Sequence, residues 1–582
     1  MSTLSPIPLH PSTATHEGVL QGLARSGLLQ DCKMLWLASA QGGWGAPSGE
    51  CTLSGTLPLG THEVQLRVRL PKRFPLCLPD IQVEGIDPHV SLPHMIGGQS
   101  ICFPEDANLL DSDDPHALAW EALVYARNLL SGMLSGSRGG EFAQEAVAYW
   151  QALARGRFIE SVVSGGEHPS PLMAFLHEGQ LWAVADDANV YAQSQPTRTL
   201  DGLTRSDALY LPLGPAMFEQ DFHPSELATL GGLRKHIRAL PEGDRLRLRM
   251  LSGDPQAKEM LLVLGLRRPQ GERALLGLRL ADIQGGHPFE DEQSQAQCEP
   301  IALVRRDLAW LAPRGGAGPD LRNRRVLLVG CGAIGGYIAL ALARAGVGHL
   351  SLVDPESFAP ENTYRHACGM ARSHEWKVDG LHQEIQRAIP YVSVQPYRMD
   401  IQDFLECNSS LVREQNLIIS AIGHPTIERH LNQRIWAEQE HPPALFTWLE
   451  PLGLGGHALL THVGNTRGCL NCLYWRPREG GPFKNRAAFA MPDAVYTRDT
   501  LGCGSRYLPF ADLDAQRTAE LASRLALRML RGEVTESQLL SWKGERRAFE
   551  QAGYSVTPRY EAEPEMGSST CHHEDCHVCG PR

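Results

Sequence analysis

The first 160 residues alternate between helix-like and strand-like patterns of apolar side chains. Apolar residues recur at helical spacing over 16–29, and partial alternation over 51–59 and 62–71 predicts two strands. Residues 116–134 carry apolar positions spaced as in a long amphipathic helix. Together these patterns predict a small α+β domain over residues 1–160.

The next region, residues 161–300, has short apolar runs separated by Gly, Pro and acidic clusters. Four of these runs predict strands, at 181–186, 208–214, 259–266 and 274–280. The polar segment 287–300 predicts a linker or an exposed loop, and we find no chemical motif in the region. We interpret residues 161–300 as a mixed α/β linker domain.

Strand and helix patterns alternate in the C-terminal half, as they do in a doubly wound α/β sheet. Strands are predicted at 324–330, 349–354 and 417–423, and helices at 335–346, 425–439 and 521–530. We therefore expect a Rossmann-like α/β domain over residues 301–582.

Composition and charge narrow the choice of protein class. The chain has 582 residues, 42% hydrophobic and 21% charged, which is typical of about three or four folded domains. A formal net charge of −12 argues against nucleic-acid binding over a broad surface. No apolar run is long enough for a membrane helix, and the N-terminus lacks the pattern of a secretory signal. We expect a cytoplasmic protein whose 14 cysteines are reduced and serve metals or catalysis.

A glycine-rich turn follows the first predicted strand of the C-terminal region. Gly330, Gly332 and Gly335 stand between that strand and the next predicted helix. Glycines let the backbone approach a phosphate closely, and a helix N-terminus offers unpaired N–H groups to an anion. The second strand ends in Asp354, where a ribose hydroxyl needs an acceptor. This order of elements predicts a nucleotide site, which could hold NAD or ATP.

The residues after Asp354 favour ATP. Asn362, Arg365 and Lys377 place two cations close after the expected ribose position. Adenylation builds negative charge on the α-phosphate and on the leaving pyrophosphate, and cations stabilise that charge. Hydride transfer with NAD has no such need for an arginine and a lysine at this place.

This segment resembles the ubiquitin-activating superfamily, which includes the adenylyltransferases of molybdopterin and thiamine biosynthesis. The shared pattern is the glycine loop, the acidic residue that ends the second strand, an Asn-x-x-Arg element and a downstream lysine. The resemblance implies that Asp354 and Glu356 hold the ribose and its surroundings. It also implies that Asn362, Arg365 and Lys377 contact phosphates.

The same resemblance implies a ThiF-type adenylation domain that forms a homodimer, in which Arg306 reaches the partner subunit's ATP. It further implies a Mg²⁺ ion, which the superfamily binds with an aspartate after the strand at 417–423. This chain has Gly423 and His424 at that place. Glu428 is a nearby candidate ligand, and it could equally be a carboxylate on a helix face.

Two C-x-x-C pairs lie far apart in the same region. They are Cys469 with Cys472 and Cys576 with Cys579. Four thiolates bind Zn²⁺ tetrahedrally, and C-x-x-C lets one turn of the backbone present two sulfurs. One pair alone could be a redox motif, but two pairs favour a structural zinc site that fixes the C-terminus to the domain.

Cys503 lies between these pairs, with a glycine on either side of it. The glycines predict a loop with an accessible thiol. Related activating enzymes carry a thioester-forming cysteine in a loop of this region, so the resemblance implies that role for Cys503. The alternative is a packed, unreactive cysteine.

The sequence around Cys102, with the proline-rich segment 71–81 before it, resembles a ubiquitin-conjugating domain. That family has a His-Pro-Asn element just upstream of its catalytic cysteine. Pro93 matches the proline, while Leu92 and His94 replace the other two residues. His94 could polarise a thioester or stabilise an oxyanion, or it could be structural. The alternative for Cys102 is a buried cysteine in an interaction domain.

Joined in one chain, the two regions are similar to the fused conjugating and activating enzymes of bacterial cyclic-oligonucleotide antiphage signalling (CBASS) operons. The resemblance implies ATP-dependent adenylation of a protein C-terminus, that of a cyclic-nucleotide synthase. A thioester relay from Cys503 to Cys102 and transfer to an amine on a target protein would follow.

Three other functions stay open from the sequence. The chain could activate and conjugate a separate ubiquitin-like or sulfur-carrier protein. It could be a scaffold whose N-terminal domain only binds a partner, or an NAD-dependent oxidoreductase.

Overall fold

The structure is a computed structural model, and two compact units make up the chain. One unit consists of residues 1–188 and 201–305, and the other of residues 189–200 and 306–582. The residues that the structure describes are 15–37, 50–84, 94–96, 100–103, 111–134, 141–195, 200–214, 223–252, 257–268, 273–438, 441–464, 466–476, 483–492, 494–499 and 506–580.

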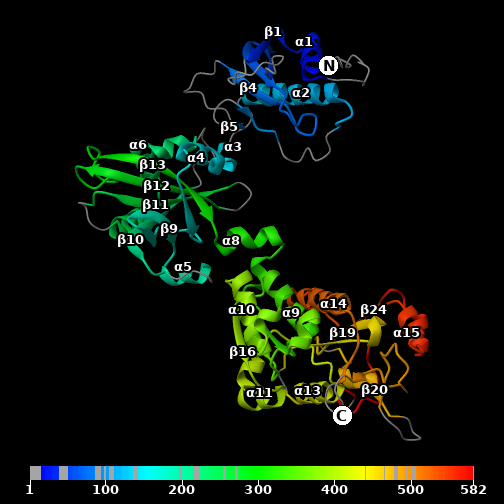
Figure 1. Ribbon diagram of the computed structural model, residues 1–582. Helices are drawn as coiled ribbons and strands as arrows, with labels where there is room; N and C mark the ends of the chain where they lie inside the picture. The colour runs from blue at the N-terminus through cyan, green and yellow to red at the C-terminus, as the bar shows by residue number, and fades with distance from the viewer. Residues whose placement is uncertain are drawn as a thin grey trace. The chain divides into compact units, whose positions relative to one another are not determined.

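The first unit begins with an antiparallel sheet in the order β1-β2-β3-β4-β6-β5, covered on one face by two helices (Figure 1). The strands are β1 (Gln30–Leu37), β2 (Glu50–Leu59), β3 (His62–Arg69), β4 (Asp80–Glu84), β5 (Met95–Ile96) and β6 (Ser100–Ile101), and the helices are α1 (His16–Arg25) and α2 (Pro115–Leu134). Alternate residues of β3, such as Leu66 and Val68, are buried against the helices, as the sequence pattern predicts. The predicted α+β domain is confirmed.

A closed barrel follows, with its strands in the order β10-β11-β12-β13-β7-β9-β8. The strands are β7 (Phe158–Val162), β8 (Ser170–His177), β9 (Gln180–Ala185), β10 (Leu203–Leu213), β11 (Met260–Arg267), β12 (Arg273–Gln284) and β13 (Gln295–Arg305). The helices of this region are α3 (Glu141–Gln144), α4 (Ala146–Ala154), α6 (Leu230–Arg238) and α7 (Glu242–Leu251). Helices α4, α6 and α7 pack on the outside of the barrel, where apolar side chains of the strands meet them. The four strands predicted in this region are all present.

The prediction of a linker or loop over 287–300 is wrong for its second half. Strand β13 starts at Gln295 and pairs antiparallel with β12. Exposed Gln295 and Gln297 alternate there with Ala296 and Cys298, which pack against the barrel core. The polar residues are thus the outer face of a strand, and the short side chains between them hid the alternation.

The second unit contains an eight-stranded sheet in the order β16-β15-β14-β17-β18-β19-β24-β25. The strands are β14 (Arg325–Val329), β15 (His349–Val353), β16 (Ser393–Tyr397), β17 (Leu417–Ser420), β18 (Ala444–Leu449), β19 (Gly455–Thr461), β24 (Gln538–Lys543) and β25 (Met566–Ser569). Neighbouring strands pair in parallel along the part β16-β15-β14-β17-β18 of the sheet. Strands β19, β24 and β25 are then added with antiparallel pairing.

Helices cover both faces of this sheet (Figure 1). Helices α9 (Ala333–Arg344), α10 (Lys377–Ala388) and α14 (Asp512–Leu530) share one apolar core with the strands, and α11 (Ile401–Cys407) and α13 (Pro425–Ala437) share the other. Shorter helices are α5 (Ala188–Ser194), α8 (Leu308–Leu311), α12 (Ser409–Arg413), α15 (Arg547–Gln551) and α16 (Pro558–Ala562). The predicted Rossmann-like fold is confirmed.

The strand order also locates the place where a ligand can bind. The chain runs from β14 outward to β15 and β16, and then returns to β17 on the other side of β14. The loops after β14 and β17 therefore diverge at the carboxyl edge of the sheet, which is where open α/β sheets bind ligands.

Among the residues that the structure describes, we find no helix with the length and apolar character of a membrane span.

Candidate functional site

The glycine loop after β14 is held in close contact with its neighbours. Gly330 has φ +87°, and a Cβ there would lie 2.8 Å from the backbone of Ala421 in the loop after β17. A Cβ on Gly335 would lie 1.8 Å from the carbonyl oxygen of Gly330. At Gly332, by contrast, a Cβ would meet no described atom within 4 Å. The loop is thus packed on two sides and open at the N-terminus of α9, as a phosphate site requires.

Asp354 joins this loop to the end of β15. One carboxylate oxygen accepts a hydrogen bond from the N–H of Cys331 at 2.7 Å, and the other accepts one from the N–H of Glu356 at 2.8 Å. Burial raises the pKa of Asp354, while the charge of Lys377 and these hydrogen bonds oppose the rise. Asp354 therefore shapes the loop, and its contact with a ribose stays a prediction.

His366 supports the same loop and was not singled out from the sequence. Its Nδ1 accepts a hydrogen bond from the N–H of Cys368 at 3.0 Å, so in the neutral ring the proton is on Nε2. Nε2 then donates to the carbonyl oxygen of Cys331 at 2.7 Å. Burial lowers the pKa of His366 to about 4, which keeps the ring neutral. In the sequence, only its position next to Arg365 could have indicated that His366 belongs to this site.

Lys377 begins α10, and its ammonium group is ion-paired with the carboxylate of Glu356. The side chain of Lys377 is only 9% exposed, whereas that of Glu356 is 69% exposed. An anionic ligand can therefore take the place of Glu356 beside the ammonium group without leaving a carboxylate buried. The structure places both predicted residues together.

Asn362 and Arg365 lie in a short 3-10 helix before α10. The side-chain oxygen of Asn362 accepts a hydrogen bond from the N–H of Ala359 at 3.2 Å. The guanidinium of Arg365 lies over the rings of Tyr507 and Phe510, with 5.6 and 5.4 Å from its central carbon to the ring centroids. Stacking on aromatic rings fixes the guanidinium plane and leaves its edge N–H groups for an anion.

Cys503 lies outside the described residues, but the strands on either side of it are described. Strands β22 (Arg498–Asp499) and β23 (Arg506–Tyr507) pair antiparallel and flank the segment that carries Cys503. Because Tyr507 contacts Arg365, strand β23, which follows this segment in the sequence, lies beside a residue of the candidate nucleotide site. Sequence reasoning could not detect this contact, since it joins positions more than a hundred residues apart.

Arg306 belongs to the second unit, where its guanidinium donates a hydrogen bond to the carbonyl oxygen of Ser194 at 3.3 Å. Its own carbonyl oxygen accepts a hydrogen bond from the hydroxyl of Tyr391. These contacts lie within one chain, so the role of Arg306 across a dimer stays a prediction.

Glu428 is buried under the loop that follows β17. Its carboxylate accepts a hydrogen bond from the hydroxyl of Ser420 at 2.9 Å and receives the N–H groups of Ile422 and Gly423. Burial raises the pKa of Glu428 to about 7, and the three hydrogen bonds only partly oppose it. This carboxyl holds the loop that diverges from the glycine loop, so it is a buried support and not an exposed group on the helix.

The four predicted zinc ligands lie together at the C-terminal end of the chain. The Sγ atoms of Cys469 and Cys472 are 3.9 Å apart, those of Cys469 and Cys576 are 3.7 Å apart, and those of Cys472 and Cys579 are 3.2 Å apart. All four are buried, and all four sulfurs lie within 4.8 Å of one another. Ligands at a Zn–S distance of about 2.3 Å in a tetrahedron are about 3.8 Å apart, so this donor set fits zinc.

Cys102 follows β6 and is half-buried. Its backbone N–H donates to the carbonyl oxygen of His94 at 2.8 Å, next to the pair formed by Met95 and Ile101. Cys102 and His94 are therefore cross-strand neighbours at the end of the β5–β6 hairpin. The structure brings together the two residues that the sequence predicts for this site.

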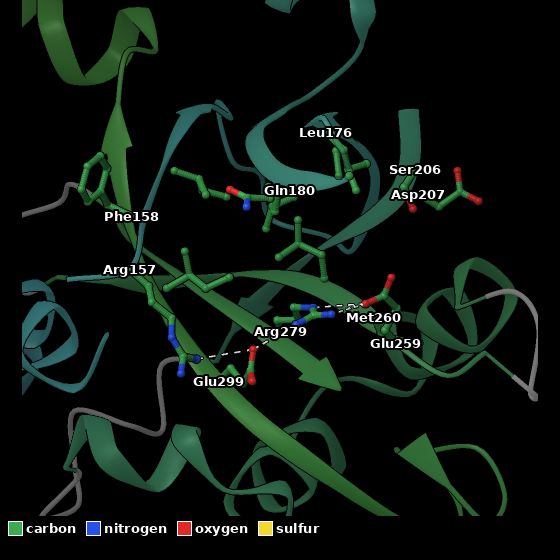
Figure 2. A pocket seen from close by; sticks show the side chains of 16 residues that line it. Arg157, Phe158, Leu176, Gln180, Ser206, Asp207, Glu259, Met260, Arg279 and Glu299 are labelled. Atoms are coloured by element: carbon green, nitrogen blue, oxygen red, sulfur yellow. Dashed lines mark hydrogen bonds and ion pairs between the residues drawn. The ribbon is translucent and has the colours of Figure 1, made fainter. Parts of the chain in front are cut away.

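The barrel of the first unit has a cavity of about 420 Å³ at one mouth, which the sequence did not reveal (Figure 2). Its floor is apolar and is formed by Ile159, Ala174, Leu181, Leu261 and Ile301. At its rim Arg279 pairs with both Glu259 and Glu299, and Arg157 pairs with Glu299 at 3.4 Å. These rim charges already neutralise one another, so they do not indicate a particular ligand.

Comparisons with known proteins match both ends of the chain. Residues 305–495 match the ThiF family, and residues 49–159 match prokaryotic E2 family B. The chain therefore joins a ThiF-family domain to a prokaryotic E2 domain, and it is an enzyme of the adenylyltransferase and ubiquitin transferase-like class. The resemblance inferred from the glycine loop and from Cys102 is confirmed for both regions.

The chain is similar to the ATP-dependent ubiquitin transferase-like protein Cap2 of Pseudomonas aeruginosa. The two are 23% identical over 477 residues, which cover 79% of this chain and 84% of that protein. The proteins of the same name from Escherichia coli and Vibrio cholerae are each 25% identical over 40% of this chain and 40% of their own length. Among solved structures, E. coli MccB with MccA-N7isoASN has 17% identity and a TM-score of 0.33, over 46% of this chain and 72% of that one.

The buried carboxyl of Glu428 makes stability depend on pH. Its folded pKa of about 7 lies above the usual value, so the folded state holds this proton more tightly than the unfolded state does. The stabilisation is complete below about pH 4.5 and is lost as the pH rises towards 7. Glu428→Gln removes this dependence while keeping an acceptor for Ser420.

We therefore expect the unfolding free energy of Glu428→Gln, relative to wild type, to rise by about 3 kcal/mol between pH 4.5 and pH 8. Urea unfolding at a series of pH values measures this difference. Exposed Glu414, exchanged for Gln, is the control and should show no such trend. A flat difference for Glu428→Gln would show that this carboxyl is ionised at no cost in the folded state.

Proposed function

We propose that this chain uses ATP to adenylate the C-terminal carboxylate of a protein. The acyl group then passes through thioesters at Cys503 and Cys102 to an amine on a target protein. The observation that carries this proposal is the contact between Arg365 and Tyr507, because Tyr507 lies in β23, which pairs with β22 on the other side of Cys503 in the sequence. ATP-dependent activation and conjugation also agree with the ThiF and E2 families of the two ends.

In the first step a carboxylate oxygen attacks the α-phosphorus of ATP, and pyrophosphate leaves. Arg365 and Lys377 are the groups proposed to stabilise the charge that develops on the phosphates. Gly332 and the N-terminus of α9 provide the open backbone against which a phosphate can lie. Asn362 is the remaining proposed phosphate contact, through the amide group that does not cap the 3-10 helix.

Mg²⁺ accompanies ATP, and the two buried carboxyls of the loops after β15 and β17, Asp354 and Glu428, are engaged in hydrogen bonds to those loops. Both oxygens of Asp354 accept hydrogen bonds, and Glu428 accepts three. These residues do not fit a metal site, so no step of the mechanism is assigned to the ion. Phosphate oxygens are the proposed ligands.

Two thioesters follow the adenylate. The thiolate of Cys503 attacks the acyl carbon and AMP leaves, since a thiolate is a good nucleophile and adenylate a good leaving group. The thiolate of Cys102 then takes the acyl group from Cys503. An amine finally attacks the thioester at Cys102, where the flanking His94 is part of the proposed site.

The activated protein is proposed to be a cyclic-nucleotide synthase, as in the CBASS operons whose fused enzymes this chain resembles. Similarity to Cap2 over 79% of the chain supports this choice. A homodimer in which Arg306 reaches the partner's nucleotide is proposed on the same grounds.

We propose that the four clustered cysteines bind a structural Zn²⁺. The distances between their sulfur atoms fit a tetrahedron. The same distances are much longer than the S–S bond of about 2.05 Å in a disulfide. A bound ion would link the segment at Cys469 to the C-terminus at Cys579. It would supply structural cohesion and no catalytic group.

Intact-mass spectrometry tests the relay. The full chain is incubated with ATP, Mg²⁺ and a cyclic-nucleotide synthase of a CBASS operon, and the same synthase without its C-terminal residue is the negative control. We expect Cys102→Ala to retain an adduct at Cys503 and to form no conjugate. Cys503→Ala should lose both thioesters, whereas Cys407→Ala, at an exposed cysteine, should behave as wild type. Wild-type conjugation in either active-site variant would contradict the relay.

Metal analysis and thermal unfolding test the zinc site. We expect one Zn²⁺ per chain, which a strong chelator or Cys472→Ser removes. Loss of about 2 kcal/mol shifts the Tm of a domain of this size by roughly 4–8 °C, so a fall of at least that size is expected. Cys407→Ser is the matched control and should retain the metal. A chain that contains no zinc and is insensitive to chelators would refute the site.

A further inference from the structure

Helix α4 links the barrel to the hairpin that carries Cys102. Its Trp150 is buried, and the indole N–H donates to the carbonyl oxygens of Gly277 at 2.8 Å and Ile301 at 3.2 Å. These contacts fix α4 on strands β12 and β13 of the barrel. At its start, the helix presents Glu145 and Tyr149 to the hairpin. Neither residue could be assigned to the Cys102 site from the sequence.

Glu145 contacts both the backbone and the side chain of His94. One carboxylate oxygen accepts a hydrogen bond from the backbone N–H of His94 at 2.9 Å, and the other lies 2.5 Å from Nδ1 of the imidazole. Burial raises the pKa of Glu145, but hydrogen bonds from His94, the charge of His94 and a hydrogen bond with Tyr149 together lower it below its usual value. Because an ionised carboxylate can only accept, Nδ1 carries a proton, and the lone pair of the neutral ring is on Nε2.

Cys102 shares this site. Its N–H is bonded to the carbonyl oxygen of His94, and the next residue, Met95, donates its N–H to the hydroxyl of Tyr149 at 3.2 Å. Burial raises the pKa of Tyr149, and negative charges on Glu145 and Cys102 contribute to the rise, as expected for neighbouring groups. Helix α4 thus holds the backbone on one side of Cys102 with two side chains.

The backbone of His94 is itself unusual. Its φ of +59° lies in the left-handed region, which non-glycine residues adopt only at a cost, and residues held in such conformations cluster at functional sites. The bond from its N–H to Glu145 helps to hold this conformation. The imidazole is thus fixed on a residue whose own carbonyl oxygen accepts the N–H of Cys102.

We propose that Glu145 is a positioning residue for aminolysis at Cys102, holding His94 so that its Nε2 takes the proton of the attacking amine. This inference rests on the proposed function, because it requires a thioester at Cys102. The amine nitrogen bonds to the acyl carbon, the C–S bond breaks, and the electron pair leaves on the sulfur of Cys102. The proton goes from the amine to Nε2 of His94 and from there to the thiolate or to water.

The test uses the full chain and loads Cys102 without ATP. Exchange with a fluorescent peptide α-thioester that ends in glycine forms the adduct, and Cys102→Ala gives the background from other cysteines. Discharge is then followed with two probes, free lysine and hydroxylamine. An alkylamine needs proton removal as it attacks, whereas hydroxylamine is weakly basic and strongly nucleophilic and needs little help from a base.

We expect Glu145→Gln to slow discharge by lysine at least tenfold, within the ~10²–10⁴ that a general base contributes. Discharge by hydroxylamine should stay within about twofold of wild type, because the isosteric amide retains an acceptor for the backbone of His94. His94→Ala should lose the same reactivity, and the double variant should lose no more, since the two residues act as one unit. Glu121→Gln, at an exposed position on α2, is the matched control.

Two outcomes would overturn the inference. One is discharge by lysine at the wild-type rate in Glu145→Gln. The other is an equal loss with both probes, which would make Glu145 purely structural. Failure of the proposed function has a different signature. In that case Cys102 would accept the peptide by thioester exchange but would gain no adduct in the presence of ATP and the substrate protein. This result would contradict the relay, and the ratio of the lysine to the hydroxylamine discharge rate would be unchanged.

Discussion

The close approach of two loops at the carboxyl edge of the second sheet is the constraint on which the candidate nucleotide site depends. The backbone of Gly330 lies against Ala421 with no room for a Cβ, and Gly335 lies against Gly330 in the same way. Buried groups then fix each loop: Asp354 and His366 hold the one after β14, and Glu428 holds the one after β17. Gly332, at the start of α9, stays open on the side that this packing does not fill.

One candidate phosphate-binding cation is held by aromatic contacts in the same unit. Arg365 rests on aromatic rings of the segment that leads to α14, so its position depends on the same hairpin that flanks Cys503. In the first unit, Cys102 follows the β5–β6 hairpin. Glu145 and Tyr149 of the α4 segment, which is not part of that sheet, accept hydrogen bonds from the backbone of His94 and Met95. In both places, contacts between residues distant in sequence fix the described surroundings of a cysteine that we propose to be reactive.

The sequence predicted the parts of the fold whose patterns are local. Strand β14, the glycine loop and α9 appear in order because apolar runs and glycines there have few alternative structures. The four cysteines could be grouped because C-x-x-C spacing implies shared geometry. By contrast, β13 was partly missed, since its inward residues are small and its outward residues polar.

The contacts that could not be predicted join distant positions. Glu428 is visible as a carboxylate in the sequence, but its burial depends on how α13 packs on β17. Glu145 is 51 residues from His94, and nothing in a single sequence links them. Such pairs are set by tertiary packing, which local patterns do not encode.

Every later step of the proposed relay requires adenylation, and ATP–pyrophosphate exchange measures adenylation without involving either thiol. We predict exchange that requires an intact C-terminus on the substrate protein and that persists in Cys503→Ala and Cys102→Ala, because both thiols act after the adenylate forms. Arg365→Ala should lower the exchange rate by about 10²–10³, as expected for loss of a group that stabilises developing charge, and Arg413→Ala should not. Absence of exchange with an intact C-terminus, or wild-type exchange in Arg365→Ala, would contradict the account.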